Sequence, residues 1–402
     1  SLLFAEPELL LELESYSNRQ HEPETVTLDD NYEEWLELNE RKEPPDITAQ
    51  DIAWILFTSG STGRPKGALL SHGAFLAGLN SAAVARPVLP SDKYLYPFPL
   101  FHVAAHNVLL QHREGACVVL MRSFDATETL EACRNPGITT MSLAPTMIGM
   151  LLDHPRFQPR DLNQVRTIGY GASAMPESLL RQLLTQTDVG LCQSYGMTEL
   201  CGSVAFLTVE DHKAAAERPG LLKSVGMPLP TAEVSIVNEC GEPCRANEPG
   251  EIIVRAAQCM SGYWRDSKAS EDALRGGWLH TGDIGYLDAE GYLYIVDRKK
   301  DMIISGGENI ASREVEEALR AHSAVKDCAV IGVADPRWGE TVCAVVILYP
   351  DANIDSEALS RHCRELLAGY KTPRHWQYAD TLPLNASGKI DKPRLREQFS
   401  QG

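Results

Sequence analysis

One ten-residue segment combines small, hydroxyl-bearing and cationic residues: Thr58-Ser59-Gly60-Ser61-Thr62-Gly63-Arg64-Pro65-Lys66-Gly67. It directly follows the apolar run 52–57, which is typical of a buried strand. A glycine-rich turn at a strand end exposes backbone N–H groups, and the hydroxyls and Lys66 add donors and positive charge. The segment therefore predicts a polyphosphate-binding loop, and the plain alternative is a polar surface loop. It is not a Walker A loop, because Pro65 precedes the lysine and Gly67 follows it.

Length and composition indicate an ordinary globular protein of at least two domains. The chain has 402 residues, a hydrophobic fraction of 44% and a charged fraction of 23%. Its formal net charge of −18 argues against a nonspecific nucleic-acid binder, since such proteins carry basic stripes. Anionic substrates must therefore be met locally, by a few placed lysine and arginine side chains.

Cysteine spacing and hydropathy favour a cytoplasmic protein. The ten cysteines show no zinc-like spacing and are interpreted as reduced thiols, most of them small core residues. No apolar run reaches membrane-spanning length and no signal peptide is visible, which predicts no integral membrane segment.

The order of strand and helix patterns predicts a layered α/β domain followed by two smaller parts. Residues 1–4 resemble the middle of a strand, and residues 5–50 are acidic and helical in pattern. Beyond them, strands are predicted at 52–57, 117–121, 139–143 and 165–169, and helices at 127–133, 146–152 and from Pro176. After residue 220, short strands at 234–237, 251–255 and 292–296 predict a small β subdomain. Past a charged break at 297–301, helices at 312–321 and 356–367 with strands at 328–333 and 342–348 predict a small α+β domain.

Further clusters place aromatic, acidic or basic residues beside glycine. They are Tyr195-Gly196-Met197-Thr198-Glu199, Gly169-Tyr170-Gly171-Ala172-Ser173, Thr281-Gly282-Asp283 with Arg298, and Gly388-Lys389. A flat aromatic side chain suits a purine, and a carboxylate suits a divalent cation that bridges phosphates. Taken singly, each cluster has a structural alternative: a helix cap, a strand-end turn, a surface ion pair or a solvated loop.

Taken together and in this order, the motifs resemble the adenylate-forming (AMP-binding) superfamily, which includes acyl-CoA synthetases, luciferases and the adenylation domains of peptide synthetases. The resemblance runs from about residue 50 to residue 400 and is greatest to acyl-CoA synthetases. It implies a large domain over residues 1–297 that lacks its upstream part, a hinge segment at 298–301 with Lys300 at the pivot, and a small mobile domain over 302–402.

The resemblance also implies a role for each motif. The phosphate loop supplies Thr58, Ser59, Gly60, Ser61, Thr62, Gly63 and Lys66; the adenine side is formed by Gly171, Ala172, Ser173, Tyr195 and Gly196; and Asp283 and Arg298 contact the ribose. Thr198 contacts phosphate and Glu199 holds Mg²⁺. Lys389 matches the family's catalytic lysine. An ammonium about 4 Å from either of two reacting anions would contribute about 4 kcal/mol at an effective dielectric of 20.

Two segments bear on the acid and its acceptor. His102, in Pro97-Phe98-Pro99-Leu100-Phe101-His102, matches the family's aromatic–histidine pair near the acyl pocket, and the alternative is a hydrogen-bonded core histidine. Residues 98–108 contain no carboxylate, which disfavours an α-amino acid, since a buried ammonium group without an anion is costly. The expected lining is small and apolar: Val103, Ala104, Ala105, Met197, Cys201 and Val204. Gly306, Gly307 and Glu308 match a loop near the pantetheine tunnel of acyl-CoA synthetases, and Ser312 is expected to cap the helix that follows.

The activity that the resemblance implies has two steps. An apolar carboxylic acid, fatty or aryl, reacts with ATP and Mg²⁺ to give an acyl-adenylate and pyrophosphate, and the acyl group then passes to coenzyme A. Two alternatives stay open: transfer to the phosphopantetheine of a carrier protein, or nucleotide binding without turnover. A homodimer is also left open.

Overall fold

The computed structural model describes residues 2–7, 10, 24–29, 32–38, 45–58, 65–135, 137–171, 175–384 and 389–399. The chain divides into two units, Ser1–Thr48 and Ala49–Gly402. In the first unit, β1 (Leu2–Ala5) pairs in parallel with β2 (Glu24–Thr27), and α2 spans Tyr32–Leu38. The predicted strand at the start is confirmed. The helical prediction for 5–50 is wrong at β2, where threonine and valine side chains favour a strand.

The main sheet of the second unit has the strand order β11-β10-β9-β8-β7-β5-β6. Its strands β9, β8, β7, β5 and β6 run parallel, whereas β10 is antiparallel to β9 and β11. The strands are β5 (Lys93–Tyr96), β6 (Cys117–Leu120), β7 (Thr140–Leu143), β8 (Thr167–Gly171), β9 (Gly190–Met197), β10 (Gly202–Leu207) and β11 (Met227–Pro228). This arrangement confirms the predicted α/β class.

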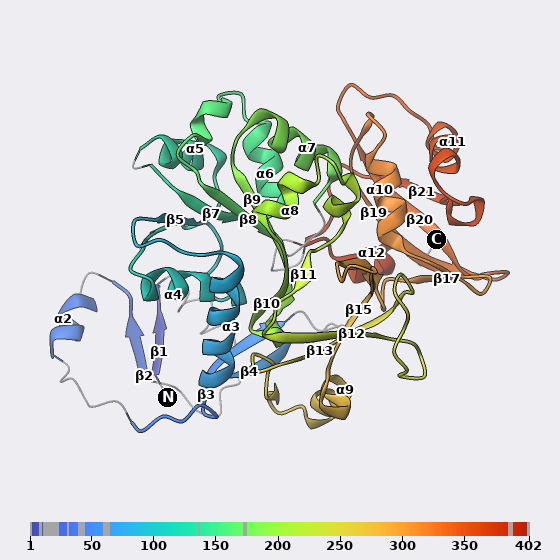
Figure 1. The fold of residues 1–402 in the computed structure, drawn as a ribbon. Coiled ribbons are helices and arrows are strands. Elements are labelled where there is room, and N and C mark those ends of the chain that lie inside the picture. Colours follow the sequence, from blue (N-terminus) through green and yellow to red (C-terminus); the bar gives the residue numbers. More distant parts are fainter. Residues whose placement is uncertain are drawn as a thin grey trace. The chain divides into compact units, whose positions relative to one another are not determined.

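Helices cover both faces of this sheet. On one face α5 (Ala126–Arg134), α6 (Pro145–Leu152) and α7 (Glu177–Gln186) lie over β7 and β8 (Figure 1). On the other, Tyr94 and Tyr96 of β5 pack beside α4 (His106–Arg113), next to α3 (His72–Ala85). Leu95 faces the first group, as the period of two in a strand requires. Helix α7 begins at Glu177, one residue after the predicted start at Pro176.

Two smaller antiparallel sheets complete this part of the unit. Strands β14, β4 and β3 form one sheet, and β12, β13, β15 and β16 form the predicted small β subdomain. The elements are β3 (Ile52–Thr58), β4 (Lys66–Ser71), β12 (Ala232–Val237), β13 (Gly250–Ala256), β14 (Gly262–Tyr263), β15 (Leu279–Leu287), β16 (Leu293–Arg298), α8 (Val209–Ala214) and α9 (Ser267–Ala273). Short 3₁₀ turns occupy Val103–Ala105, Pro159–Leu162, Thr198–Leu200, Pro219–Lys223, Arg275–Gly277 and Gly369–Lys371.

The last part of the chain builds a separate sheet with helices on both faces. It contains β17 (Ile303–Ser305), β18 (Glu308–Ile310), β19 (Val325–Asp335), β20 (Gly339–Leu348), β21 (His375–Tyr378), α10 (Ser312–Arg320), α11 (Ser356–Leu366) and α12 (Lys392–Phe399). Cys328 and Val330 of β19 pack with α10 and α11, whereas Ala329 and Ile331 pack with Leu395 of α12. The predicted helices and strands after residue 301 are therefore confirmed.

Among the residues that the structure describes, no helix combines the length and apolar character that crossing a membrane requires. All ten cysteines are free thiols, and six of them are buried in hydrophobic clusters: Cys133, Cys192, Cys201, Cys328, Cys343 and Cys363.

Candidate functional site

The predicted phosphate loop connects two antiparallel strands. Thr58 ends β3 and pairs with Lys66, which begins β4, and the Thr58 hydroxyl donates to the Lys66 carbonyl at 3.4 Å. Ser59, Gly60, Ser61, Thr62 and Gly63 lie outside the described residues. The hairpin brings both ends of the segment together, and it places the Lys66 ammonium 5.2 Å from the ring centroid of Tyr263.

Glu199 is a buried carboxylate beside that tyrosine. It lies in the 3₁₀ turn after Thr198, has 6% of its surface exposed, and accepts a hydrogen bond from the Tyr263 hydroxyl at 2.8 Å. Burial, followed by the charge of Glu199, raises the pKa of Tyr263, so this phenol remains a donor. Tyr263 sits on the two-residue strand β14, opposite Ala68 of β4. The sequence motifs did not single it out, yet it links Lys66 to Glu199.

Asp283, Arg298 and Tyr195 meet although they are far apart in the sequence. Asp283 of β15 and Arg298 of β16 are direct partners in the strand pairing, with Arg298 Nε 3.3 Å from Asp283 Oδ1. The Tyr195 hydroxyl donates to Asp283 Oδ2 at 2.8 Å, and burial, followed by the Asp283 charge, raises the pKa of this tyrosine. Asp283 is 6% exposed. A buried carboxylate with spare lone pairs beside an aromatic ring suits the two hydroxyls of a ribose.

Lys389 lies among these charged groups. Removal of water by the surrounding protein and the charge of Arg298 lower the pKa of Lys389, whereas the Asp283 and Glu199 charges raise it. The same ammonium lowers the pKa of His102, after the larger effect of burial. His102 is half-buried and packs against the Phe101 ring, with ring centroids 4.6 Å apart. The structure thus brings together Lys389, Asp283, Glu199, Arg298 and His102.

Two glycines of the predicted adenine side are required by strand packing. A Cβ atom at Gly171 would lie 2.6 Å from the Ser194 carbonyl oxygen, and one at Gly196 would overlap the Gly202 backbone. The close neighbour at both positions is protein backbone, so the pairing of the strands itself requires glycine there. Ala172 and Ser173 lie outside the described residues.

Replacing Gly196 with alanine is expected to lower the free energy of unfolding by about 1–3 kcal/mol, because the β9–β10 pair must shift to admit the methyl group. Denaturant unfolding measures this change. Gly220→Ala is the matched control, since no atom lies within 4 Å of its added Cβ, and its effect should stay within about 0.5 kcal/mol. Equal effects of the two substitutions would contradict this account of Gly196.

Gly306 and Gly307 form the turn between β17 and β18, with φ values of 62° and 87°. Both angles lie in the left-handed region that favours glycine, and Glu308 starts the return strand with an exposed side chain. Trp338 lies against this turn: its carbonyl accepts from Gly306 N at 2.8 Å, and the Arg337 and Arg374 guanidinium carbons lie 4.7 and 4.8 Å from its ring centroid. This cluster of one tryptophan and two arginines was not predicted from the sequence.

The prediction that Ser312 caps α10 is wrong. The N-cap position of α10 is Ala311, which makes no side-chain cap, and Ser312 is the first helical residue. Its hydroxyl and its amide both donate to Asp297, at 2.7 and 2.5 Å. The capping group therefore comes from the end of β16.

An α/β sheet domain that brings a tyrosine, two buried carboxylates and a lysine together fits the adenylate-forming class. Residues 2–264 match the AMP-binding enzyme family, and residues 314–389 match the AMP-binding enzyme C-terminal domain. The chain therefore belongs to the AMP-binding enzyme family.

Named relatives agree with this assignment. A feruloyl-CoA synthase from Amycolatopsis sp. is 39% identical over 361 residues, which cover 89% of this chain and 72% of that protein. An o-succinylbenzoate CoA synthetase from Bacillus subtilis, solved with its acyl-adenylate intermediate, superposes with a TM-score of 0.85 at 31% identity, covering 100% of this chain and 78% of that one. An amide bond synthetase from Marinactinospora thermotolerans has a TM-score of 0.87 at 33% identity, with 99% and 80% covered.

Proposed function

We propose that this chain is an AMP-forming CoA ligase, which converts a carboxylic acid and ATP to an acyl-adenylate and pyrophosphate and then forms a CoA thioester. Membership of the AMP-binding enzyme family supports the adenylation step, and the feruloyl-CoA and o-succinylbenzoate CoA relatives support CoA as the acceptor. The observation that carries the proposal is the position of Lys389 among Asp283, Glu199 and Arg298.

Each side chain of the cluster answers one requirement of adenylation. The carboxylate of the acid must approach the α-phosphate of ATP, and both are anions, so a nearby ammonium lowers the cost of their meeting. Lys389 is proposed for this role. Asp283 is proposed to accept the ribose hydroxyls beside Arg298, and Tyr195 to contact the adenine. Thr58, Lys66 and Thr198 are proposed to face the phosphates.

Glu199 fits a magnesium ligand by its chemistry. It is a buried carboxylate with one oxygen held by the Tyr263 hydroxyl, and the Lys66 ammonium lies over the ring of the same tyrosine. A hard divalent cation prefers such oxygen ligands and, when bound with ATP, neutralises phosphate charge. Tyr263 orients the carboxylate and keeps it from turning away from the site.

The acid is proposed to be apolar, fatty or aryl. Residues 98–108 offer no carboxylate to an α-amino group. Val103, Met197, Cys201 and Val204 belong to one apolar cluster, which supports apolar surroundings for the acid. Ala104 and Ala105 lie in the adjoining cluster around Tyr94 and Tyr96. His102 is proposed to lie between the acyl pocket and Lys389, since the charge of Lys389 lowers the pKa of its imidazole.

The Gly306 turn is proposed as the contact for CoA, and the cations around Trp338 support this. A flat ring with two guanidinium groups close to it suits a nucleotide that carries phosphates. Trp338→Ala is expected to raise the KM for CoA about tenfold and to leave acid-dependent pyrophosphate release unchanged. Trp278→Ala is the matched control, because Arg255 stacks on Trp278 at 4.5 Å outside this turn. An unchanged KM for CoA would remove Trp338 from the acceptor site.

The domain limits of the sequence analysis are kept as part of the proposal: a large domain over 1–297, a hinge segment at 298–301 and a small domain over 302–402. The first family match ends at residue 264 and the second begins at residue 314, and this gap supports a domain boundary between them. A cytoplasmic location is proposed too, and the ten free thiols are consistent with a reducing compartment.

A panel of carboxylic acids tests the proposed function, with pyrophosphate release measured with and without CoA. At least one fatty or aryl acid should release pyrophosphate, and CoA should raise its turnover and yield a thioester. If the protein acylates a carrier protein or an amine and forms no acyl-CoA, the acceptor is not CoA. An amine acceptor would match the amide bond synthetase to which this chain is similar. Stabilisation by ATP without pyrophosphate release from any acid would leave only nucleotide binding.

A further inference from the structure

Helix α10 is capped by a residue from the strand that precedes the proposed hinge segment. The Asp297 carboxylate, at the end of β16, accepts from the Ser312 amide at 2.5 Å, from the Ser312 hydroxyl at 2.7 Å and from the Arg313 amide at 3.4 Å. Its other oxygen accepts from the Arg298 amide at 2.7 Å. The α10 N-cap residue itself, Ala311, has no group that can do this. The first turn of α10 therefore depends on Asp297.

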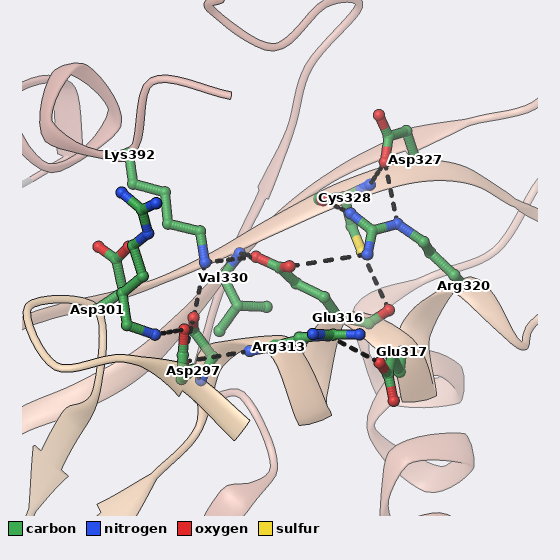
Figure 2. A network of polar contacts seen from close by, with 12 residues as sticks. Asp297, Asp301, Arg313, Glu316, Glu317, Arg320, Asp327, Cys328, Val330 and Lys392 are labelled. Atoms are coloured by element: carbon green, nitrogen blue, oxygen red, sulfur yellow. Dashed lines mark hydrogen bonds and ion pairs between the residues drawn. The ribbon is translucent and has the colours of Figure 1, made fainter. Parts of the chain in front are cut away.

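A lysine joins this cap to the segment that carries Lys389. Lys392 begins α12, three residues after Lys389, and its ammonium lies 2.6 Å from the Ser312 hydroxyl and 2.8 Å from Glu316 Oε1. Figure 2 shows Lys392 reaching between Asp297 and Glu316. Burial raises the pKa of Asp297, whereas Lys392 and the Ser312 donors lower it, so the buried carboxylate relies on these partners for its charge.

The contacts of Asp297 span the proposed hinge segment. Asp297 precedes residues 298–301, whereas Ser312, Glu316 and Lys392 follow them. The Arg313 guanidinium makes a second, longer contact across it, 3.4 Å from the Ile295 carbonyl oxygen. By contrast, the ion pair of Asp301 with Arg396, at 2.8 Å, joins the last residue of the hinge segment to α12. A rotation about residues 298–301 would separate Asp297 from Ser312 and leave both Asp301 and Lys392 with their C-terminal partners.

We propose that Asp297 is a positioning residue, which through Ser312 and Lys392 holds the small domain in the orientation that brings Lys389 to Asp283 and Glu199. The inference rests on the proposed function, since it assigns the adenylation step to this orientation and the thioester step to another. A helix cap shifts an equilibrium by roughly 2- to 30-fold, which is enough to bias two orientations of one domain. A cap that only stabilised α10 would affect both half-reactions equally.

The test measures the two half-reactions separately in Asp297→Asn, at saturating ATP so that altered ATP binding near Arg298 does not enter. Adenylation is followed by pyrophosphate release without CoA, and thioester formation by acyl-CoA production from a supplied acyl-adenylate. The adenylation rate divided by the thioester-formation rate should fall about tenfold. Asp161→Asn is the control: Asp161 is equally buried, holds Arg134 at 2.8 Å and caps within the large domain. It should lower stability without changing the ratio.

A second variant separates positioning from helix capping. Asp297→Asn combined with Ala311→Ser gives α10 a cap of its own, which should recover thermal stability but not the rate ratio. An unchanged ratio in Asp297→Asn, or a ratio restored by Ala311→Ser, overturns the proposal.

Amide hydrogen exchange distinguishes this inference from the proposed function. If the parent protein releases no pyrophosphate with any acid, the function fails and exchange at Ser312 and Arg313 remains as the readout. Slow exchange in the parent and at least tenfold faster exchange in Asp297→Asn supports the contact of Asp297 with Ser312 and Arg313, on which the positioning role depends. Equal exchange in the two proteins overturns it.

Discussion

Replacing Lys389 with alanine is expected to lower the rate of adenylation about 10²- to 10³-fold while sparing thioester formation from a supplied acyl-adenylate. The reason is electrostatic: Lys389 lies beside Asp283, Glu199 and Arg298, where it can balance the charge that builds up as two anions react. Loss of one preorganised donor to such a charge costs about this much in other enzymes. Single-turnover pyrophosphate release and acyl-CoA formation measure the two steps.

Two variants control for the loss of a lysine as such. Lys371→Ala removes a lysine of the C-terminal part whose ammonium pairs with Glu314 at 2.6 Å, and it should leave both steps within about twofold. Lys389→Arg keeps the positive charge and should lose less than the alanine variant. A Lys389→Ala protein that loses both steps equally would contradict a role confined to adenylation.

The second large effect is expected for Glu199→Gln, with adenylation lowered about 10²-fold at low Mg²⁺ and a higher Mg²⁺ concentration needed for half-maximal rate. An amide keeps the size of Glu199 but removes the charge that a hard cation prefers. Its packing and its contact with the Tyr263 hydroxyl can be preserved. Titration of Mg²⁺ at fixed ATP measures the shift.

Tyr263→Phe is the companion variant. It removes the hydrogen bond to Glu199 and leaves the carboxylate charge, so the rate should fall by about tenfold with little change in the Mg²⁺ dependence. A Glu199→Gln protein with the Mg²⁺ titration of the parent would show that another group holds the metal.

The sequence predicted the regular elements well where a strong periodic pattern fixed them. Strands such as β3 and β13 and helices such as α5 and α11 lie within one or two residues of their expected limits. The exceptions arise from pairing with distant residues. Strand β2 forms beside β1, and β19 extends beyond its apolar run because it pairs with β20 along its whole length.

The sequence predicted only those site residues that belong to a recognisable motif. Tyr195, Asp283, Arg298 and Lys389 were expected to share a site by resemblance, and the structure brings them together. Tyr263 was missed because a two-residue strand leaves no periodic signal in the sequence. The cap of α10 was misassigned because its acceptor, Asp297, lies 15 residues upstream of Ser312 and is recognisable only from tertiary structure.

Acid-dependent exchange of labelled pyrophosphate into ATP, measured without CoA, tests the central claim most directly. A reversible, enzyme-bound acyl-adenylate requires this exchange, so it should appear with an accepted acid in the parent protein and disappear in Lys389→Ala. Thioester formation from acid, ATP and CoA with no such exchange, or with ADP as the nucleotide product, would contradict an adenylate mechanism for this chain.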